Sequence, residues 1–252
     1  MIRGLYALAA ALRANIKRQE AVSYNLVNVN TTGFKQNAFA VKSSPVWSLV
    51  RLSGEPVEGE APVAIGALGT GVTPAELSVD LAQGPLAASD RPLDLAIVGD
   101  GFFRVQTPAG ERYTRDGSFH RDARGWLVTV DGYPVLGDEG PLQIGDGNVT
   151  IANDGTVYSD GTRVGRLSLA QIAAQDLRRE GDNLLAADPD AVQLLLAAET
   201  QVRQGFLEQS NVDLAGSVTA MMWALRAYEA NQRILRLQDQ TLTQATQVGK
   251  PG

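Results

Sequence analysis

Apolar side chains recur at alternating spacings of four and three along the first 30 residues. This heptad period places them on one seam of a helix and is typical of a coiled coil. No Pro or Gly interrupts the chain between Leu5 and Thr32, and Gly33 then supplies a natural helix stop. The pattern predicts an N-terminal helix over residues 1–33. The seam consists of Met1, Leu5, Leu8, Leu12, Asn15, Gln19, Val22, Leu26 and Val29.

A second seam with the same period runs through the C-terminal segment and predicts a helix over residues 206–247. Asn211 or Ser210 can cap its start, and Gly249 with Pro251 lies in the tail, residues 248–252. An ordinary amphipathic helix packed on a globular domain would show a similar stripe, so periodicity alone leaves both interpretations open. The seam consists of Leu214, Val218, Met221, Leu225, Tyr228, Gln232, Leu235, Asp239 and Leu242.

The middle of the chain has a different pattern. Asp-Gly pairs at 116–117, 131–132, 154–155 and 160–161 separate short runs that alternate or are β-branched. Such pairs between apolar runs are strong hairpin signals, because Gly accepts a positive φ. Residues 64–205 are therefore predicted to form an antiparallel β domain. The runs are 93–98, 102–106, 126–130, 148–152 and 163–169.

The segment before this domain, residues 34–63, is expected to be an extended linker. Its stretch from Ser43 to Pro62 is rich in Pro, Gly, Ser and Glu. The expected fold class is α+β: long N- and C-terminal helices, forming a coiled-coil region, flank a central all-β domain rich in antiparallel hairpins.

Composition removes several kinds of chemistry. The 252 residues include no Cys and one His, which excludes a disulfide framework, a thiol nucleophile and a cysteine-ligated or His-rich metal site. With 22 basic and 28 acidic residues the net charge is −6, which argues against nucleic acid as the main partner.

Charge is distributed unevenly along the chain. Residues 1–42 hold six basic and one acidic side chain, residues 43–205 hold 12 and 23, and residues 206–252 hold four of each. Chance can produce such an asymmetry, but it suggests that the predicted helices and the predicted β domain have different surroundings.

Calcium and phosphate loops are not supported by spacing. The segment from Asp154 to Gly161 lacks the alternating ligands and terminal Glu of an EF-hand loop. Gly66, Gly69 and Gly71 form a Gly-rich stretch, but no strand–loop–helix unit surrounds them. We expect no metal site and no cofactor.

No catalytic set can be assembled from the sequence. His120 has no nameable acid or nucleophile partner, and Asp188 and Asp190 flank a Pro, where a solvated turn is the default interpretation. Because no nucleophile, base and oxyanion donors occur in a plausible arrangement, we expect a protein that is not an enzyme.

The first residues also resemble the start of a secretory signal peptide. Arg3 precedes an apolar run from Leu5 to Leu12, and the alanines at 9–11 imitate a cleavage site. Against cleavage, basic residues follow at once and the seam continues in register, which a discarded peptide does not need. No stretch approaches 18 apolar residues, so no membrane-spanning helix is expected.

Specific phrases at both ends, and three more between them, resemble the bacterial flagellar rod and hook protein family. Residues 25–35 read N-L-V-N-V-N-T-T-G-F-K, residues 207–213 read L-E-Q-S-N-V-D, and residues 226–231 read R-A-Y-E-A-N. Residues 101–103, 113–119 and 132–135 resemble the family's β-domain phrases. The matching residues at the ends are Asn25, Leu26, Asn28, Thr31, Gly33, Phe34, Lys35, Glu208, Ser210, Asn211, Val212, Arg226, Tyr228, Glu229 and Asn231.

This resemblance covers nearly the whole chain in the right order and implies a structural subunit. Family members pass uncleaved through the flagellar type III export apparatus and stack as a helical tube across the periplasm. The implied partners are further copies of the chain, other rod proteins, the hook protein and surrounding ring proteins, with neither nucleic acid nor a small-molecule substrate.

In such a tube the terminal helices form the inner coiled coil and the β domain forms the outer layer. The resemblance therefore implies that the seam residues pack within or between subunits. They are Leu5, Leu8, Leu12, Val22, Leu26, Leu214, Val218, Met221, Leu225, Tyr228, Leu235 and Leu242.

Within the family, the length favours a rod protein over the generally longer hook proteins. The opening residues 1–6 and the long segment 33–72 resemble the distal rod type, which is the favoured interpretation. Residues 91–94 and 134–137, followed by Gly140 and Pro141, are shared with a proximal rod type of similar length. From another functional class, a secreted binding or adhesive module with a coiled-coil stalk is the alternative.

Overall fold

The computed structural model describes residues 2–51, 63–75, 77–181, 183–195 and 200–248. The chain divides into two compact units. Unit 1 comprises Met1–Ser23, Phe39–Leu77 and Ala215–Gly252, and unit 2 comprises Tyr24–Ala38 and Ser78–Leu214. Part of the expected linker, residues 52–62, and most of the expected tail lie outside the described residues.

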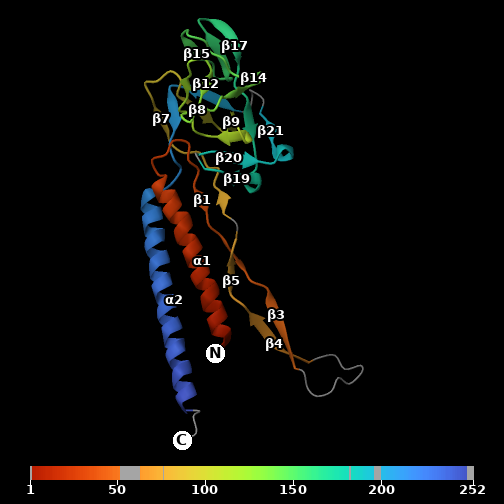
Figure 1. Ribbon diagram of the computed structural model, residues 1–252, viewed down its shortest axis with the longest axis vertical. Helices are drawn as coiled ribbons and strands as arrows, with labels where there is room; N and C mark the ends of the chain where they lie inside the picture. Colours follow the sequence, from red (N-terminus) through yellow and green to blue (C-terminus); the bar gives the residue numbers. More distant parts are fainter. Residues whose placement is uncertain (1, 52–62, 76, 182, 196–199, 249–252) are drawn as a thin grey trace. The chain divides into compact units, whose positions relative to one another are not determined.

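Both predicted terminal helices are present, as α1 (Ile2–Val27) and α2 (Leu214–Val248). The predicted start of the second helix at residue 206 is wrong, because Phe206–Glu208 form strand β23, which pairs with β7 (Leu86–Ala88). Within unit 1 α1 and α2 lie side by side and run in opposite directions (Figure 1). The two helices contact each other at Gly4, where an added Cβ would lie 2.8 Å from Nε2 of the Gln238 side chain. The helices and the β domain between them confirm the predicted α and β elements, whereas the coiled coil stays a prediction.

Helix α1 ends earlier than the seam predicts. The amide side chain of Asn28 donates to the carbonyl of Tyr24 (2.8 Å), and the hydroxyl of Thr31 donates to Oδ1 of Asn28 (3.2 Å). Short polar side chains of this kind compete for the last helical carbonyls and favour turns. Residues 28–33 consequently form turns instead of a further helical turn.

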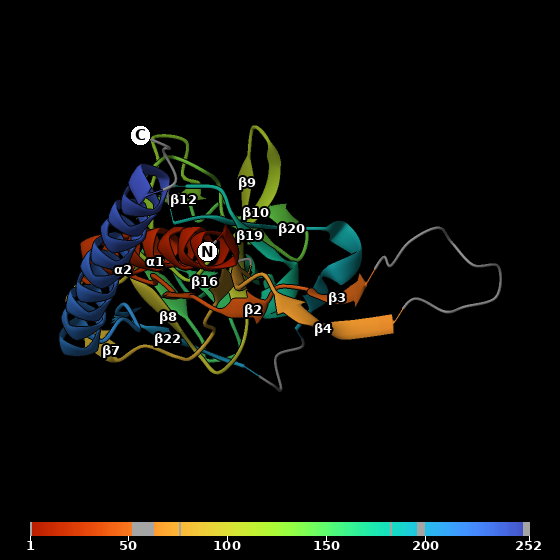
Figure 2. The same ribbon diagram turned by 90° about the horizontal axis from the view of Figure 1, so that it is seen from below.

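Residues 41–51 of the expected linker form one arm of a two-stranded ribbon in unit 1, whereas Asn37–Ala38 form β1 in unit 2. Strand β3 (Val46–Arg51) pairs with β4 (Val63–Gly69), and β2 (Val41–Ser43) pairs with β5 (Val72–Pro74). Figure 2 shows β3 and β4 as neighbouring strands. The run Val46–Val50 is rich in β-branched and aromatic residues, which favours a strand despite the Pro, Gly and Ser around it.

Unit 2 contains a six-stranded antiparallel sheet in the order β19-β20-β10-β9-β18-β21 and a three-stranded sheet, β15-β16-β17. Two-stranded pairs complete it: β1-β6, β23-β7, β22-β8, β11-β12 and β13-β14. The strands are β1 (Asn37–Ala38), β6 (Ser78–Val79), β7 (Leu86–Ala88), β8 (Leu95–Val98), β9 (Phe102–Thr107), β10 (Gly110–Thr114), β11 (His120–Arg121), β12 (Leu127–Val128), β13 (Leu136–Gly137), β14 (Gly140–Pro141), β15 (Val149–Ile151), β16 (Thr156–Ser159), β17 (Thr162–Arg166), β18 (Leu169–Gln171), β19 (Leu177–Arg179), β20 (Leu185–Ala187), β21 (Gln193–Leu194), β22 (Gln201–Gln204) and β23 (Phe206–Glu208). Two short 3₁₀ helices, Ala174–Asp176 and Pro189–Ala191, lie in its loops.

The hairpin prediction holds for some Asp-Gly pairs and not for others. Asp160 and Gly161 have φ values of 49° and 79° and connect the paired strands β16 and β17. Residues 154–155 likewise connect β15 and β16, which pair. Residues 116–117, in contrast, lie between β10 and β11, which have different partners, so this pair is not a hairpin turn.

One apolar core holds most of unit 2 together. Phe103 and Phe119 meet edge to face with ring centroids 5.0 Å apart, at the centre of a cluster that draws on strands β8 to β22. A smaller cluster under the six-stranded sheet includes Phe102 and Tyr113. Burial of these aromatic side chains stabilises the unit that carries the junction described below.

Candidate functional site

The N-terminal seam is only half-buried in unit 1, and alanines occupy the closely packed face of α1. Ala7, Ala14 and Ala21 recur every seven residues and so share one face. An added Cβ at Gly71, in the ribbon, would lie 3.3 Å from Cα of Ala7, so backbone approaches backbone here. Ala14 and Ala21 are buried, whereas the seam residues Leu8, Leu12, Val22 and Leu26 are half-buried. The side chain of Leu5 lies outside the described ones.

On α2 the predicted seam divides between two surfaces. Ala224 is the buried apolar residue of this helix among the described side chains. At about 100° per residue, Met221, Tyr228 and Leu235 lie within about 60° of it, and they are half-buried. The remaining seam residues, Leu214, Val218, Leu225 and Leu242, are exposed.

These positions define two apolar flanks of α2, one on each side of the buried face. The Leu225 flank, Val218 and Leu225, lies about 100–120° from Ala224 in one direction. The Trp223 flank, Trp223, Ile234 and Leu237, lies about 80–140° away in the other direction. Val218 and Leu225 are 42% and 38% exposed, and Trp223 is 65% exposed.

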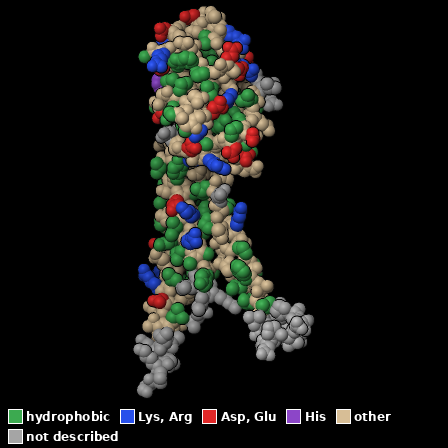
Figure 3. Space-filling model, turned by 45° about the vertical axis from the view of Figure 1, so that its right-hand side comes forward, with side chains coloured by type: hydrophobic (Ala, Val, Ile, Leu, Met, Phe, Trp, Pro, Cys, Tyr) green, Lys and Arg blue, Asp and Glu red, His purple; other side chains and the backbone are tan. Residues whose placement is uncertain are grey.

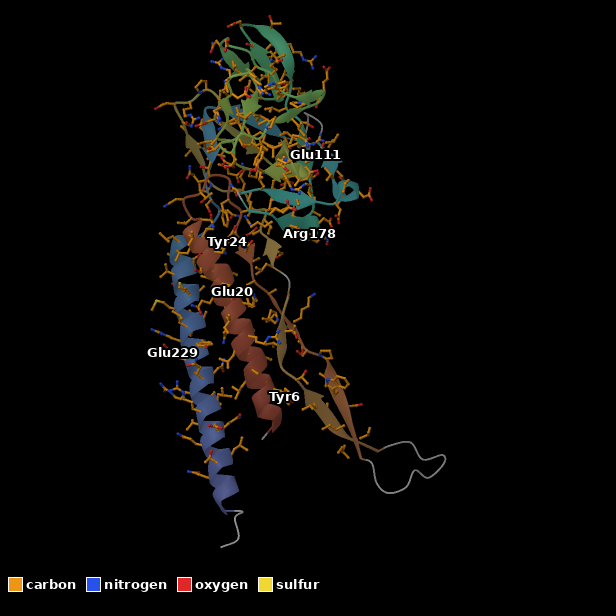
Figure 4. The ribbon with its side chains drawn as sticks, in the orientation of Figure 1. Tyr6, Glu20, Tyr24, Glu111, Arg178 and Glu229 are labelled. Atoms are coloured by element: carbon orange, nitrogen blue, oxygen red, sulfur yellow. The ribbon has the colours of Figure 1, made fainter. Side chains whose placement is uncertain are left out.

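The side of α2 opposite Ala224 carries charged residues together with the exposed Met222. Figure 4 places Glu229 on the side away from α1, and Arg226 and Arg233 are also exposed there. Hydrophobic side chains are visible on the surface of the lower half of the space-filling view (Figure 3). Exposed apolar side chains on both flanks of α2 favour a protein interaction site there.

The residues of the two terminal phrases meet in unit 2, at a buried cluster that we call the charged junction: Lys35, Arg115 and Glu208. Nζ of Lys35 lies 2.6 Å from Oε1 of Glu208, and Nη1 of Arg115 lies 2.9 Å from its Oε2. The three residues are 2%, 4% and 1% exposed. One carboxylate therefore bridges two cations that lie far apart in the sequence.

Backbone groups accept or donate further hydrogen bonds at the charged junction, while Nε of Arg115 is buried without a hydrogen-bond partner. Lys35 also donates to the carbonyl of Ala82 (2.8 Å), and Arg115 donates to the carbonyl of Gly99 (2.6 Å). The amide of Gly84 donates to Oε1 of Glu208 (2.9 Å). Burial lowers the pKa of Lys35, and contact with Glu208 opposes this shift. Burial likewise lowers the pKa of Arg115. The arrangement joins two cationic side chains to one carboxylate.

Gly33 allows the two phrases to approach each other. Its φ is 65°, and an added Cβ would overlap the backbone of Arg115 and Asp116. Its amide donates to the carbonyl of Glu208 (2.7 Å). A side chain here would force the turn after α1 away from the segment that carries Arg115.

Asparagine side chains hold the segments on either side of the junction. Asn25 accepts a hydrogen bond from the amide of Asn37 (2.8 Å) and donates one to its carbonyl (3.0 Å), which holds the last turn of α1 against β1. Asn211 accepts from the amide of Gln36 (2.7 Å) and donates to the carbonyls of Asp80 and Ala82, each 3.0 Å away. Asn25 and Asn211 therefore each fix a neighbouring segment by hydrogen bonds to its backbone.

Arg179, on β19, is a further part of this region that the sequence reasoning missed. Its guanidinium lies 4.6 Å from the ring centroid of Phe34 and 5.5 Å from that of Tyr24, and it donates to the carbonyl of Lys35 (2.6 Å). Burial lowers its pKa. Nothing in the run Leu177-Arg178-Arg179-Glu180 distinguishes Arg179 as the arginine that takes this position.

The other phrase residues have separate places. Ser210 and Val212 are buried beside the junction, and Oγ of Ser210 accepts from the amide of Val212 (3.3 Å). The phrase R-A-Y-E-A-N lies on α2 in unit 1, with its Arg226 and Glu229 exposed, Tyr228 and Asn231 half-buried. The structure does not bring that phrase into the junction.

No metal-ligating group of three His, Cys, Asp or Glu side chains occurs among the described residues. In the same part of the chain, no helix is both long and apolar enough to cross a membrane. His120 lies on β11, and Asp188 and Asp190 lie at a 3₁₀ turn.

Three family models match successive parts of the chain. Residues 5–35 match a flagella basal body rod protein model, residues 96–159 a flagellar hook protein FlgE/F/G D1 domain, and residues 203–248 a flagellar basal body rod FlgEFG protein C-terminal model. The first and last matches contain the phrases that meet at the junction.

The chain is also similar to named proteins over nearly its whole length. It is 30% identical to the flagellar hook-basal body complex protein FlhO of Bacillus subtilis (strain 168), over 99% of the chain and 100% of that protein. It is 33% identical to the basal-body rod protein FlgG of Buchnera aphidicola subsp. Acyrthosiphon pisum (strain APS), over 98% and 100%. Identity to the rod protein FlgF of Caulobacter vibrioides (strain ATCC 19089 / CIP 103742 / CB 15) is 36%, over 86% and 85%.

Proposed function

Because the chain belongs to the flagellar basal-body rod and hook protein family, we propose that it is a structural subunit of the flagellar rod that assembles helically with further copies of itself. The family is structural, and the chain is not an enzyme. The proposed product is the hollow shaft that joins the motor to the hook. The proposed neighbours are other rod proteins, the hook protein and the surrounding rings.

The observation that carries self-assembly is the apolar surface of α2. The Leu225 flank and the Trp223 flank lie on opposite sides of the face that is buried within unit 1. A helix with two exposed apolar flanks can contact two further helices, whereas a helix that only covers its own domain needs one apolar face. The proposal assigns both flanks to helices of neighbouring copies, and so places α1 and α2 in an inner tube.

Export without cleavage is part of the same proposal. Cutting after Ala11 would remove Ala7 and Ala10, and the latter's Cβ would lie 3.1 Å from a Cβ added at Gly71. The N-terminal run thus contributes to unit 1, as a discarded peptide would not. Mass spectrometry of the chain recovered from basal bodies should return an N-terminus that includes these residues. A chain that begins after residue 11 would contradict uncleaved export.

The distal rod type is the favoured member, with the proximal rod type second. The opening residues and the long segment 33–72 support the distal type, together with 33% identity to an FlgG over the full length of that relative. Similarity to FlgF proteins supports the second candidate. Electron microscopy of basal bodies from a deletion strain separates them, because a missing distal subunit leaves a short proximal stub and a missing proximal subunit leaves no rod above the motor.

The experiment that tests assembly is complementation of the deletion strain with Leu225→Asp. Leu225 is exposed in the single chain, so the variant should fold normally, while a carboxylate in an apolar helix contact should prevent rod formation. The matched control is Arg233→Ala, on the polar side of the same helix. Normal rods in the Leu225→Asp strain would refute the assignment of this flank, and a motile deletion strain would refute the rod function.

A further inference from the structure

We propose that Glu208 is the closing residue of unit 2: its docking allows Lys35 and Arg115 to be buried, so the unit closes only when the segment that leads into α2 is in place. The segments after α1 and before α2 would then be anchored in one cooperative step. This inference concerns folding of the single chain and does not rest on rod assembly.

The first argument is the balance of charge. The charged junction buries two cations and one anion, and the carboxylate of Glu208 is the group with which both cations pair. A buried cation that loses its counter-ion is strongly destabilising, far more than the loss of an exposed pair. Carbonyls of Ala82 and Gly99 accept hydrogen bonds from the two cations but supply no negative charge.

The second argument is how many segments converge on one residue. Besides the two cations, Glu208 accepts from Gly84 through its side chain and from Gly33 through its carbonyl. Its strand β23 pairs with β7, where Glu208 lies opposite Leu86. Separations of 173 residues to Lys35 and 93 to Arg115 mean that neither contact can form locally.

Two glycines beside the junction are packed too closely to accept a side chain. An added Cβ at Gly84 would overlap the carbonyl oxygen of Gln209, and one at Gly33 would overlap the backbone of Arg115. Three backbone segments are therefore in direct contact around the carboxylate. Displacement of Glu208 would therefore break the contacts of all three segments together, because a close-packed interior leaves no space for a small shift of one segment alone.

Native-state amide exchange on the unchanged full-length protein tests this directly. Three amides report on the junction: Gly33, which donates to the carbonyl of Glu208, Gly84, which donates to its carboxylate, and Gln36, which donates to Asn211. We expect all three to exchange at the slow rate of the core amides of β9, because none opens until the unit unfolds. Three different rates, all faster than those of β9, would overturn the proposal.

Substitution supplies the second test. Glu208→Gln keeps the size of the side chain but removes the carboxylate with which both buried cations pair, leaving only the more distant Asp80 and Asp100. We expect exchange at the three junction amides and in β9 to accelerate together, by about a hundredfold or more. Acceleration at Gly84 alone would reduce Glu208 to a local hydrogen-bond partner and would overturn the proposal. The control is Asp188→Asn, whose carboxylate lies 3.8 Å from Nη2 of Arg178 at the surface and whose loss should leave β9 unchanged.

A rescue variant keeps the test decisive if Glu208→Gln does not fold. Lys35→Met combined with Glu208→Gln removes one of the two unpaired cations and replaces it with an apolar chain of similar length. If unpaired charge is the cause, the double variant unfolds at a higher denaturant concentration than Glu208→Gln alone. An equal or lower midpoint would show that charge is not what Glu208 supplies, and the proposal would fail.

Discussion

The Trp223 flank makes a prediction whose size follows from exposure. Trp223→Ala removes the largest side chain of this flank, which is 65% exposed in the single chain. A Trp presents about 250 Å², so about 160 Å² remain to be covered by a neighbour. At about 25 cal/mol per Å², burial of that area contributes up to about 4 kcal/mol to each helix contact.

The single chain should hardly notice the change. An exposed side chain contributes little to folding, and Ala has a higher helix propensity than Trp, so we expect the unfolding midpoint of the monomer to stay constant or rise slightly. Assembly should respond strongly. Even half of the estimated energy raises the concentration needed for polymerisation by about 30-fold, since about 1.4 kcal/mol corresponds to a factor of ten.

Two measurements on purified protein check this prediction. Sedimentation gives the concentration above which the chain forms polymers, and thermal unfolding gives the stability of the monomer. Arg233→Ala, which also shortens an exposed side chain of α2, should alter neither quantity appreciably. Polymerisation of Trp223→Ala at the wild-type concentration would refute the view that this flank is an assembly contact. A large loss of monomer stability would show instead that Trp223 packs within one chain.

Three further predictions concern unit 2 and its surroundings. Gly84→Ala should destabilise the protein by about 3 kcal/mol, because the added Cβ overlaps a carbonyl oxygen, whereas Gly69→Ala, with open space around it, should leave the thermal midpoint unchanged. Burial raises the pKa of Asp116, so its ionised form costs stability at neutral pH and that cost disappears as the pH falls. Asp116→Asn should therefore unfold at higher denaturant than wild type at pH 7, with the gap closing below the ordinary pKa of 3.8; an equal gap at both pH values would contradict this. Arg179→Lys should cost about 1–2 kcal/mol in chemical unfolding, since an ammonium loses the planar contact with Phe34, and no loss would show that the stack contributes nothing.

Periodicity predicted the elements well where one rule decides the structure. The apolar spacing of residues 2–27 and 214–248 depends on local geometry alone, and both helices are present. The Asp-Gly signal succeeded at 160–161 because the flanking strands pair directly. It failed at 116–117 because those strands pair with partners far along the chain, which no local pattern specifies.

The ribbon was missed because composition was averaged over unlike segments. Pro, Gly and Ser between residues 43 and 62 suggested an unpaired linker, while Val46–Val50 within it reads as a strand. Its partner, β4, begins beyond the next turn, and the pairing becomes visible only when the two runs are aligned. A heptad count selects large apolar residues. It therefore could not reveal that alanines line the closely packed face of α1, where a small side chain allows the backbone to approach Gly71.

The charged junction shows most clearly what a sequence pattern can and cannot state. Lys35, Arg115 and Glu208 were recognised as letters of family phrases, and by residue type each would be assigned to the surface. These side chains are buried because Lys35 and Arg115 both pair with the carboxylate of Glu208, which lies far from them in the sequence. The phrases at the two ends therefore need not be separate signals for two helices. Both phrases contribute residues to one buried contact. The effect of a substitution at Lys35 on stability therefore depends on whether Glu208 is present. Rescue of Glu208→Gln by Lys35→Met would be the expected sign of this coupling.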